Sequence, residues 1–225
     1  VRFLGAQAPI PADVAAWAGL NAFAGKAGQM LLVPGAGGGL DQVLVGTGKA
    51  FDPQAVRALA GKLPTGLYRL ELAGDEAAPA ALAFALGAYV FDRYKDRSER
   101  PRPRLVAPPE LDVAEALRIV AACDLAREMI DTPAADMGPL QIETIAREIA
   151  EAHGAAFTVV TGDDLLEQNY PAVHAVGRAA APHRAPRLIE IGWNLDRTDA
   201  PLVALVGKGV VFDTGGLDLK AAAGM

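Results

Sequence analysis

Hydrophobic and polar positions along the first hundred residues predict a small mixture of strands and helices. Short apolar runs at residues 29–33, 42–45 and 67–72 predict β-strands. Longer segments at residues 52–62 and 76–94 predict helices. This order predicts a small α/β domain of about a hundred residues.

A glycine-rich stretch, GAGGG at residues 35–39, follows the first of these strands. Phosphate-binding loops also follow strands, but they carry the pattern GxxxxGK[ST] and lead into a helix. Here that pattern is missing and a second strand follows. We therefore expect a hairpin loop and no phosphate site.

A helix is predicted from Asp112, because Glu115 three residues later gives a start that resembles a capping box. The sequence Thr132-Pro133 predicts its end. Apolar residues recur every fourth position and predict the face that packs on the core: Val113, Leu117, Ala121, Leu125 and Met129.

A second helix is predicted to open at Gly138-Pro139, with proline at the first helical position. Strands are then predicted at residues 157–161, 172–176, 187–193 and 202–206. This order predicts a helix-flanked, largely parallel sheet. Ligands of such sheets bind beyond the carboxyl ends of the strands, where Lys208 lies.

A charged, proline-rich segment separates the two halves. Residues 95–104 read KDRSERPRPR, and Pro108-Pro109 follow. We interpret this basic run as a solvated linker and not as an anion site. The predicted domains are therefore an N-terminal α/β domain with its linker at 1–110 and a second domain at 111–225.

Composition limits the classes of function. The 225 residues are 52% hydrophobic and 21% charged, with a net charge of −6, which favours a globular cytoplasmic enzyme over a general nucleic-acid binder. Since no run of 18 apolar residues occurs, no membrane span is predicted. The single cysteine, Cys123, excludes an internal disulfide, and we expect it to be a buried structural thiol.

Histidine and arginine give no further candidates. The three histidines, His153, His174 and His183, lack the HExxH spacing of a zinc helix. His174 falls in a predicted strand and is interpreted as structural. Arg178 and Arg187 receive no role.

The strongest candidate site lies near the C-terminus, where the sequence reads VGKGVVFDTGGLDLK from residue 206 to residue 220. Lys208 and Asp213 are five residues apart, so a straight strand would send them to opposite faces. Bends at the glycines between and after them would let both reach one centre. A carboxylate suits Mn, Zn or Mg, and a lysine amine coordinates a metal only in its neutral form.

A second interpretation needs no ligand. Asp213-Thr-Gly-Gly is a plausible turn in its own right, and both lysines could be surface residues. That interpretation explains the aspartate, but not two lysines at a strand end. A site is therefore the better hypothesis.

The 206–220 segment resembles the signature of the M17 leucyl aminopeptidases. Two upstream segments, 131–139 and 170–178, are also similar to segments of that family. Asp131 and Ala135 stand where the family commonly has asparagine, and Thr214 stands for the commoner serine. The resemblance covers about residue 125 onward and is weak over the first hundred residues.

The resemblance implies a metal-dependent aminopeptidase that releases N-terminal residues, leucine among them, from peptides with a free N-terminus. It implies two divalent ions per subunit, Mn or Zn, with Lys208 as ligand of one and Asp213 bridging both. Lys220 would be catalytic and bind the oxygen of the scissile carbonyl. The resemblance further implies a homo-hexamer, and it allows a bicarbonate ion.

The family's remaining ligands, a further Asp and an Asp-x-Glu pair, have no counterpart in the sequence, and neither does its bicarbonate-holding arginine. The chain also opens on Val1. We therefore expect the sequence to be one portion of a longer protein. The alternative is a non-catalytic homologue or fragment that acts in binding or assembly.

Overall fold

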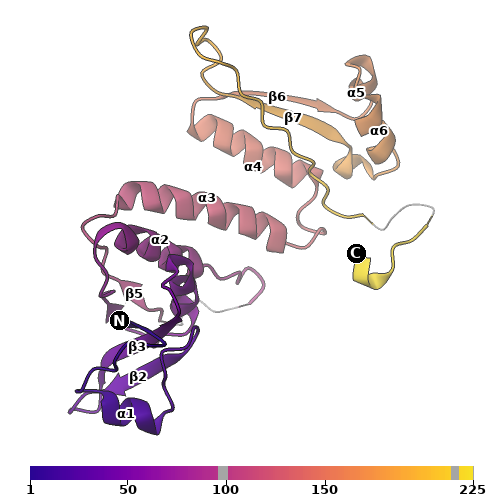
Figure 1. Ribbon diagram of the computed structural model, residues 1–225. Coiled ribbons are helices and arrows are strands. Elements are labelled where there is room, and N and C mark those ends of the chain that lie inside the picture. The colour runs from indigo at the N-terminus through magenta and orange to yellow at the C-terminus, as the bar shows by residue number, and fades with distance from the viewer. Residues whose placement is uncertain (96–100, 214–217, 225) are drawn as a thin grey trace. The chain divides into compact units, whose positions relative to one another are not determined.

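The computed structural model describes residues 1–95, 101–213 and 218–224, and its fold is mixed α/β (Figure 1). Contacts divide the chain into two compact units, Val1–Glu128 and Met129–Met225. No helix among the described residues is long and apolar enough to cross a membrane.

The first unit combines short strands with helices that pack against both faces of the three-stranded sheet. A three-stranded sheet has the order β1-β3-β2, with β1 parallel and β2 antiparallel to β3, and β4 pairs with β5 in parallel. Its elements are β1 (Arg2–Gly5), α1 (Ala15–Leu20), β2 (Met30–Pro34), β3 (Leu40–Gly48), η1 (Pro53–Gly61), β4 (Leu67–Tyr68), η2 (Gly74–Glu76), α2 (Ala77–Gly87), β5 (Arg104–Leu105) and most of α3 (Val113–Asp131).

One buried cluster of this unit lies where β3 meets η1 and α2, and another lies between the sheet and α1. Burial of these apolar side chains is the main driving force for the packing. Ala80 and Val56 are fully buried at the contact of the two helices. The first of these clusters consists of Val43, Val45, Val56, Leu59, Leu63, Tyr68, Ala80 and Phe84.

The glycine-rich stretch is a hairpin loop, as predicted. It joins β2 to the antiparallel β3, and the amide of Gly35 donates to the carbonyl of Gly39 at 2.8 Å. Gly38 has φ +80°, a conformation that favours glycine. The glycine-rich stretch therefore forms the turn between β2 and β3.

Two predicted helices of this unit are shorter or tighter than expected. The helix predicted at 52–62 is the 3₁₀ helix η1, where Pro53 occupies the first turn and Asp52 accepts from the Gln54 amide at 2.9 Å. The helix predicted at 76–94 ends at Gly87. A β-carbon at Gly87 would lie 2.0 Å from the carbonyl oxygen of Arg57, so only glycine fits this helix contact.

The start of α3 is confirmed, since the Glu115 amide donates to Asp112 Oδ1 at 3.0 Å. The predicted core face is wrong in its first half. Val113 and Leu117 are 46% and 62% exposed, whereas Ala116 is buried. Each step of four residues advances about 40° beyond a full turn, so such a stripe winds around the helix and leaves the packed face.

The second unit is built on one antiparallel strand pair with helix α4 against it (Figure 1). The guanidinium of Arg147 on α4 lies 4.3 Å from the ring centroid of Phe157 on β6. Its elements are α4 (Pro139–Ala152), β6 (Ala156–Thr161), α5 (Asp164–Glu167), α6 (Pro171–Gly177), η3 (Pro182–Arg184), β7 (Arg187–Gly192) and η4 (Ala222–Gly224).

The strand predicted at 172–176 is instead helix α6. Pro171 stands in its first turn, where the missing N–H costs nothing and the fixed φ favours a helix. The Arg178 amide donates to the carbonyl of His174 at 2.8 Å and completes the last turn. His174 is thus on a helix, where its Nε2 lies 3.0 Å from Asp163 Oδ1.

The strand predicted at 202–206 is absent from the described structure, where these residues are irregular and exposed. The predicted parallel arrangement also differs, because β6 and β7 run antiparallel. An apolar run becomes a strand only when a neighbouring strand satisfies its backbone groups. Leu205 and Val206 are 94% and 96% exposed, so no packing fixes them as a strand.

Candidate metal centre

Lys208 lies on the exposed irregular segment of the second unit. A β-carbon built on the next residue, Gly209, would lie 3.9 Å from Cδ1 of Ile142 on α4. Lys208 is therefore beside the first turns of α4, and not at the end of a strand as predicted. Its side chain has no recorded partner among the described residues.

Asp213 and Lys220 are brought together by the structure. Lys220 Nζ donates to Asp213 Oδ2 at 2.8 Å, which is also an ion pair. The two side chains are 47% and 37% exposed, so water screens the pair and its net stabilisation is at most about 1 kcal/mol. The chain thus places the carboxylate and one of the two amines at one point.

The bends predicted at Gly215 and Gly216 fall on residues 214–217, which lie outside the described residues. The bend predicted at Gly209 falls within them. Gly209 is not among the residues with positive φ. The approach of Lys208 to Asp213 consequently stays a prediction.

The donor types suit a divalent ion, but their number is small. Asp213 offers two oxygens and Lys208 one nitrogen, whereas each ion takes at least four ligands. In the described part of the chain, no group of three or more His, Cys, Asp or Glu side chains gathers. These residues fit as part of a metal centre, and further donors are needed to complete it.

The turn between α3 and α4 is held by an arginine that the sequence pattern did not single out. Arg184 donates through both terminal nitrogens, to the carbonyls of Ala134 and Ala135, at 2.8 Å each. A β-carbon at Gly138 would lie 3.1 Å from Arg184 Nη1, so glycine leaves room for the guanidinium. The Gly138 amide is capped by Gln141 Oε1 at 3.0 Å.

A second arginine fixes α4 to β7. Arg187 pairs with Glu143, and these side chains are only 7% and 13% exposed. Glu143 also accepts from Arg147 at 3.0 Å. The helix beside Lys208 is thus tied to the sheet by a largely buried ion network. No sequence pattern pointed to Arg187, because an arginine at the start of a strand is usually solvated.

The fold is that of an α/β protein, and the donor types near its C-terminus fit part of a metal centre. Two family models match the chain. The M17 aminopeptidase N-terminal domain matches residues 6–108, and the cytosol aminopeptidase family catalytic domain matches residues 124–225. The chain belongs to the M17 cytosol aminopeptidase family.

Named relatives and solved structures agree with this assignment. The chain is 33% identical over 208 residues to the probable cytosol aminopeptidase of Rhodococcus opacus, across 83% of this chain and 41% of that protein. It resembles the crystal structure of cytosol aminopeptidase from Coxiella burnetii with a TM-score of 0.82 and 34% identity, across 96% of this chain and 47% of that one.

A third similar structure is the bottromycin maturation enzyme BotP in complex with Mn, with a TM-score of 0.76 and 29% identity. It is matched by 99% of this chain and 50% of its own. The chain therefore spans less than half of the named relative from Rhodococcus and about half of these two structures.

Proposed function

We propose that the protein containing this chain is a metal-dependent aminopeptidase of the cytoplasm. Its substrates would be peptides with a free N-terminus, leucine-type residues among those released. One observation carries the proposal: the family signature is complete at residues 206–220, and its Asp213 and Lys220 are in contact. Support also comes from the relatives, which are named cytosol aminopeptidases, and from the Mn complex of BotP.

In this proposal, Asp213 and Lys208 hold two divalent ions, Mn or Zn, together with donors beyond the described residues. Bound ions of this kind supply Lewis acidity that generates a nucleophile from water at neutral pH. Asp213 would contribute its carboxylate oxygens to this centre. Lys208 would contribute its amine nitrogen from the segment beside α4. A bicarbonate ion would be a further component of the site.

Lys220 has a different task. Its ammonium donates to Asp213 in the structure, and it would exchange that carboxylate for the carbonyl oxygen of the scissile peptide bond. There it would stabilise the negative charge that develops when water attacks the carbonyl carbon. Loss of one such donor typically lowers the rate by about 10²–10³-fold.

Asp213 gives the direct test of the metal assignment. In protein of the length of its relatives, Asp213→Asn should lower the bound metal after dialysis from two ions per chain, because an amide oxygen is a weaker ligand than a carboxylate. The matched control is Asp218→Asn, two positions from Lys220. Unchanged metal content in Asp213→Asn would contradict the assignment and favour a non-catalytic role in binding or assembly.

A further inference from the structure

The three-stranded sheet of the first unit has an open edge along β2. In the order β1-β3-β2, β2 pairs with β3 on one side, and no strand among the described residues pairs with its other side. The carbonyl of Gln29 accepts from the Gly46 amide at 2.8 Å, which fixes the phase of the antiparallel ladder. The backbone groups of Met30 and Leu32 therefore point away from β3. An edge of this kind is a template on which a strand of another chain can pair.

One acceptor of this edge is taken by a side chain. Trp17 on α1 donates from its indole Nε1 to the carbonyl oxygen of Leu32 at 3.0 Å. A strand added at the edge would place an amide nitrogen about 2.9 Å from the same oxygen. The indole nitrogen thus occupies the position that the backbone of an added strand would need.

The packing of α1 holds the indole there. Ala18 on this helix and Val14 just before it are buried against one face of the sheet. The carbonyl of Trp17 accepts from Asn21 Nδ2 at 2.9 Å. The side chain lies at the rim between α1 and β2, 39% exposed, and its one polar atom is the donor to Leu32 (Figure 1).

Pro34 blocks the end of the same edge. It is the last residue of β2, and it has no N–H to offer to another strand. Proline on an edge strand is one of the means by which proteins prevent pairing between molecules. The edge groups left without a recorded partner in the described part of the chain are the Leu32 amide and the amide and carbonyl of Met30.

We propose that Trp17 guards this edge and keeps a second copy of the chain from adding its own β2 there. Two β2 strands from two copies would pair antiparallel about a twofold axis, because the same edge would supply donors and acceptors on both sides. With the indole in place, this ladder loses the Leu32 acceptor and the space beside it. Copies of the chain therefore associate through other surfaces. The proposal concerns the first unit and does not depend on the candidate metal centre.

The test is sedimentation velocity of the 225-residue chain at micromolar concentrations. Trp17→Ala removes the indole, and Trp17→Phe keeps an aromatic ring but removes the donor. Both variants should self-associate more than the wild type, and Trp17→Ala should do so most. The matched control is Trp193→Ala, which changes the second of the two tryptophans, 67% exposed and in the other unit, and should sediment like the wild type.

Two further measurements distinguish an opened edge from a loosened core. In the associated Trp17→Ala chain, the amides of Met30 and Leu32 should exchange with deuterium about tenfold more slowly than in the wild type, since an added strand bonds them. A loosened core would make exchange faster. Leu32→Pro, combined with Trp17→Ala, should abolish the association, because it removes an outward N–H and no bond to β3.

Three results would overturn the proposal. The first is sedimentation of both Trp17 variants like the wild type. The second is association that Leu32→Pro leaves intact, and the third is association in which the Met30 and Leu32 amides exchange as fast as in the wild type. Circular dichroism checks the fold of each variant, and if Trp17→Ala is unfolded, the same measurements on Trp17→Phe decide.

Discussion

At the scale of single residues, Tyr68 shows how one position serves both core and turn. Its ring belongs to the buried cluster of the first unit, and its hydroxyl donates to the carbonyl of Pro64 at 2.8 Å. Burial raises the pKa of this phenol above its usual value, because the charged form loses its water. The apolar run at residues 67–72 predicted a strand here, but neither the burial of Tyr68 nor its bond to Pro64.

This shift predicts a pH dependence. The unfolded chain releases the Tyr68 proton at a lower pH than the folded chain, so the folded state binds more protons at alkaline pH. The stabilisation is complete below the unfolded pKa and is lost as pH rises toward the folded one. Absorbance titration should show one of the four tyrosines ionising last, and Tyr68→Phe should remove that step. An unchanged titration in Tyr68→Phe would contradict it.

Arg184 shows what sequence patterns miss at this scale. Its two hydrogen bonds go to backbone carbonyls of Ala134 and Ala135, and backbone acceptors leave no mark in the sequence. They also do not depend on the side chain at 135, where the family commonly has asparagine. The motif residues, in contrast, are visible in the sequence because charged side chains among glycines are unusual.

At the scale of elements, the sequence predicted correctly the turns and helix starts that depend on interactions between nearby residues. The hairpin at 35–39, the start of α3 and the proline that opens α4 are all observed where predicted. The predicted strands at 172–176 and 202–206 are wrong. At residues 172–176, Pro171 favours the first turn of a helix. At residues 202–206, a strand would need a neighbouring strand, and an apolar pattern cannot show whether one is present.

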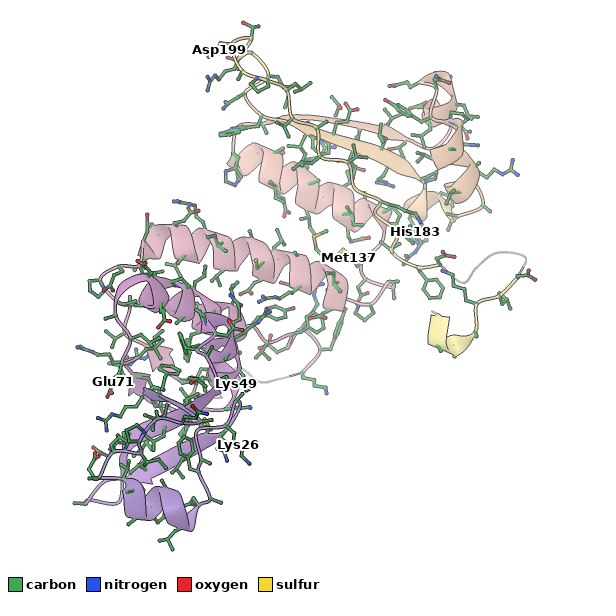
Figure 2. The ribbon with its side chains drawn as sticks, viewed as in Figure 1. Lys26, Lys49, Glu71, Met137, His183 and Asp199 are labelled. Carbon is green, nitrogen blue, oxygen red and sulfur yellow. The ribbon has the colours of Figure 1, made fainter. Side chains whose placement is uncertain are left out.

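The attachment of α4 to β7 should be energetically important. Arg187→Ala leaves Glu143 largely buried with the weaker contact of Arg147, and removing one partner of a buried pair costs about 3–5 kcal/mol. The measurement is urea unfolding of the 225-residue chain. Arg197→Ala is the matched control in the same unit, because its partner Asp199 lies on an exposed loop (Figure 2). Equal destabilisation by both variants would contradict this account.

At the scale of the whole molecule, two units and two family models divide the chain. We propose domains at 1–110 and 111–225, as expected from the linker, and the matches at 6–108 and 124–225 support this division. Contacts place the boundary after Glu128, because Arg127 on α3 donates to the carbonyl of Leu86 on α2 at 2.7 Å. The first part of α3 thus packs with the N-terminal unit.

We also propose that the protein, at the length of its relatives, assembles as a homo-hexamer. The large exposed apolar side chains, Val113 and Leu117 on α3 among them, leave surface that subunit contacts could cover. Sedimentation at micromolar concentration should give the mass of six subunits. A monomer under these conditions would contradict the assembly.

The central claim is the division of labour between the two lysines, and one paired measurement tests it. Metal content after dialysis and kinetics on leucine amide, across metal concentrations, should be compared for Lys208→Ala and Lys220→Ala in protein of the relatives' length. Lys208→Ala should lose metal, and excess metal should partly restore its rate. Lys220→Ala should keep its metal while kcat falls about 10²–10³-fold. Loss of metal in Lys220→Ala, or a full rate in it, would contradict the account.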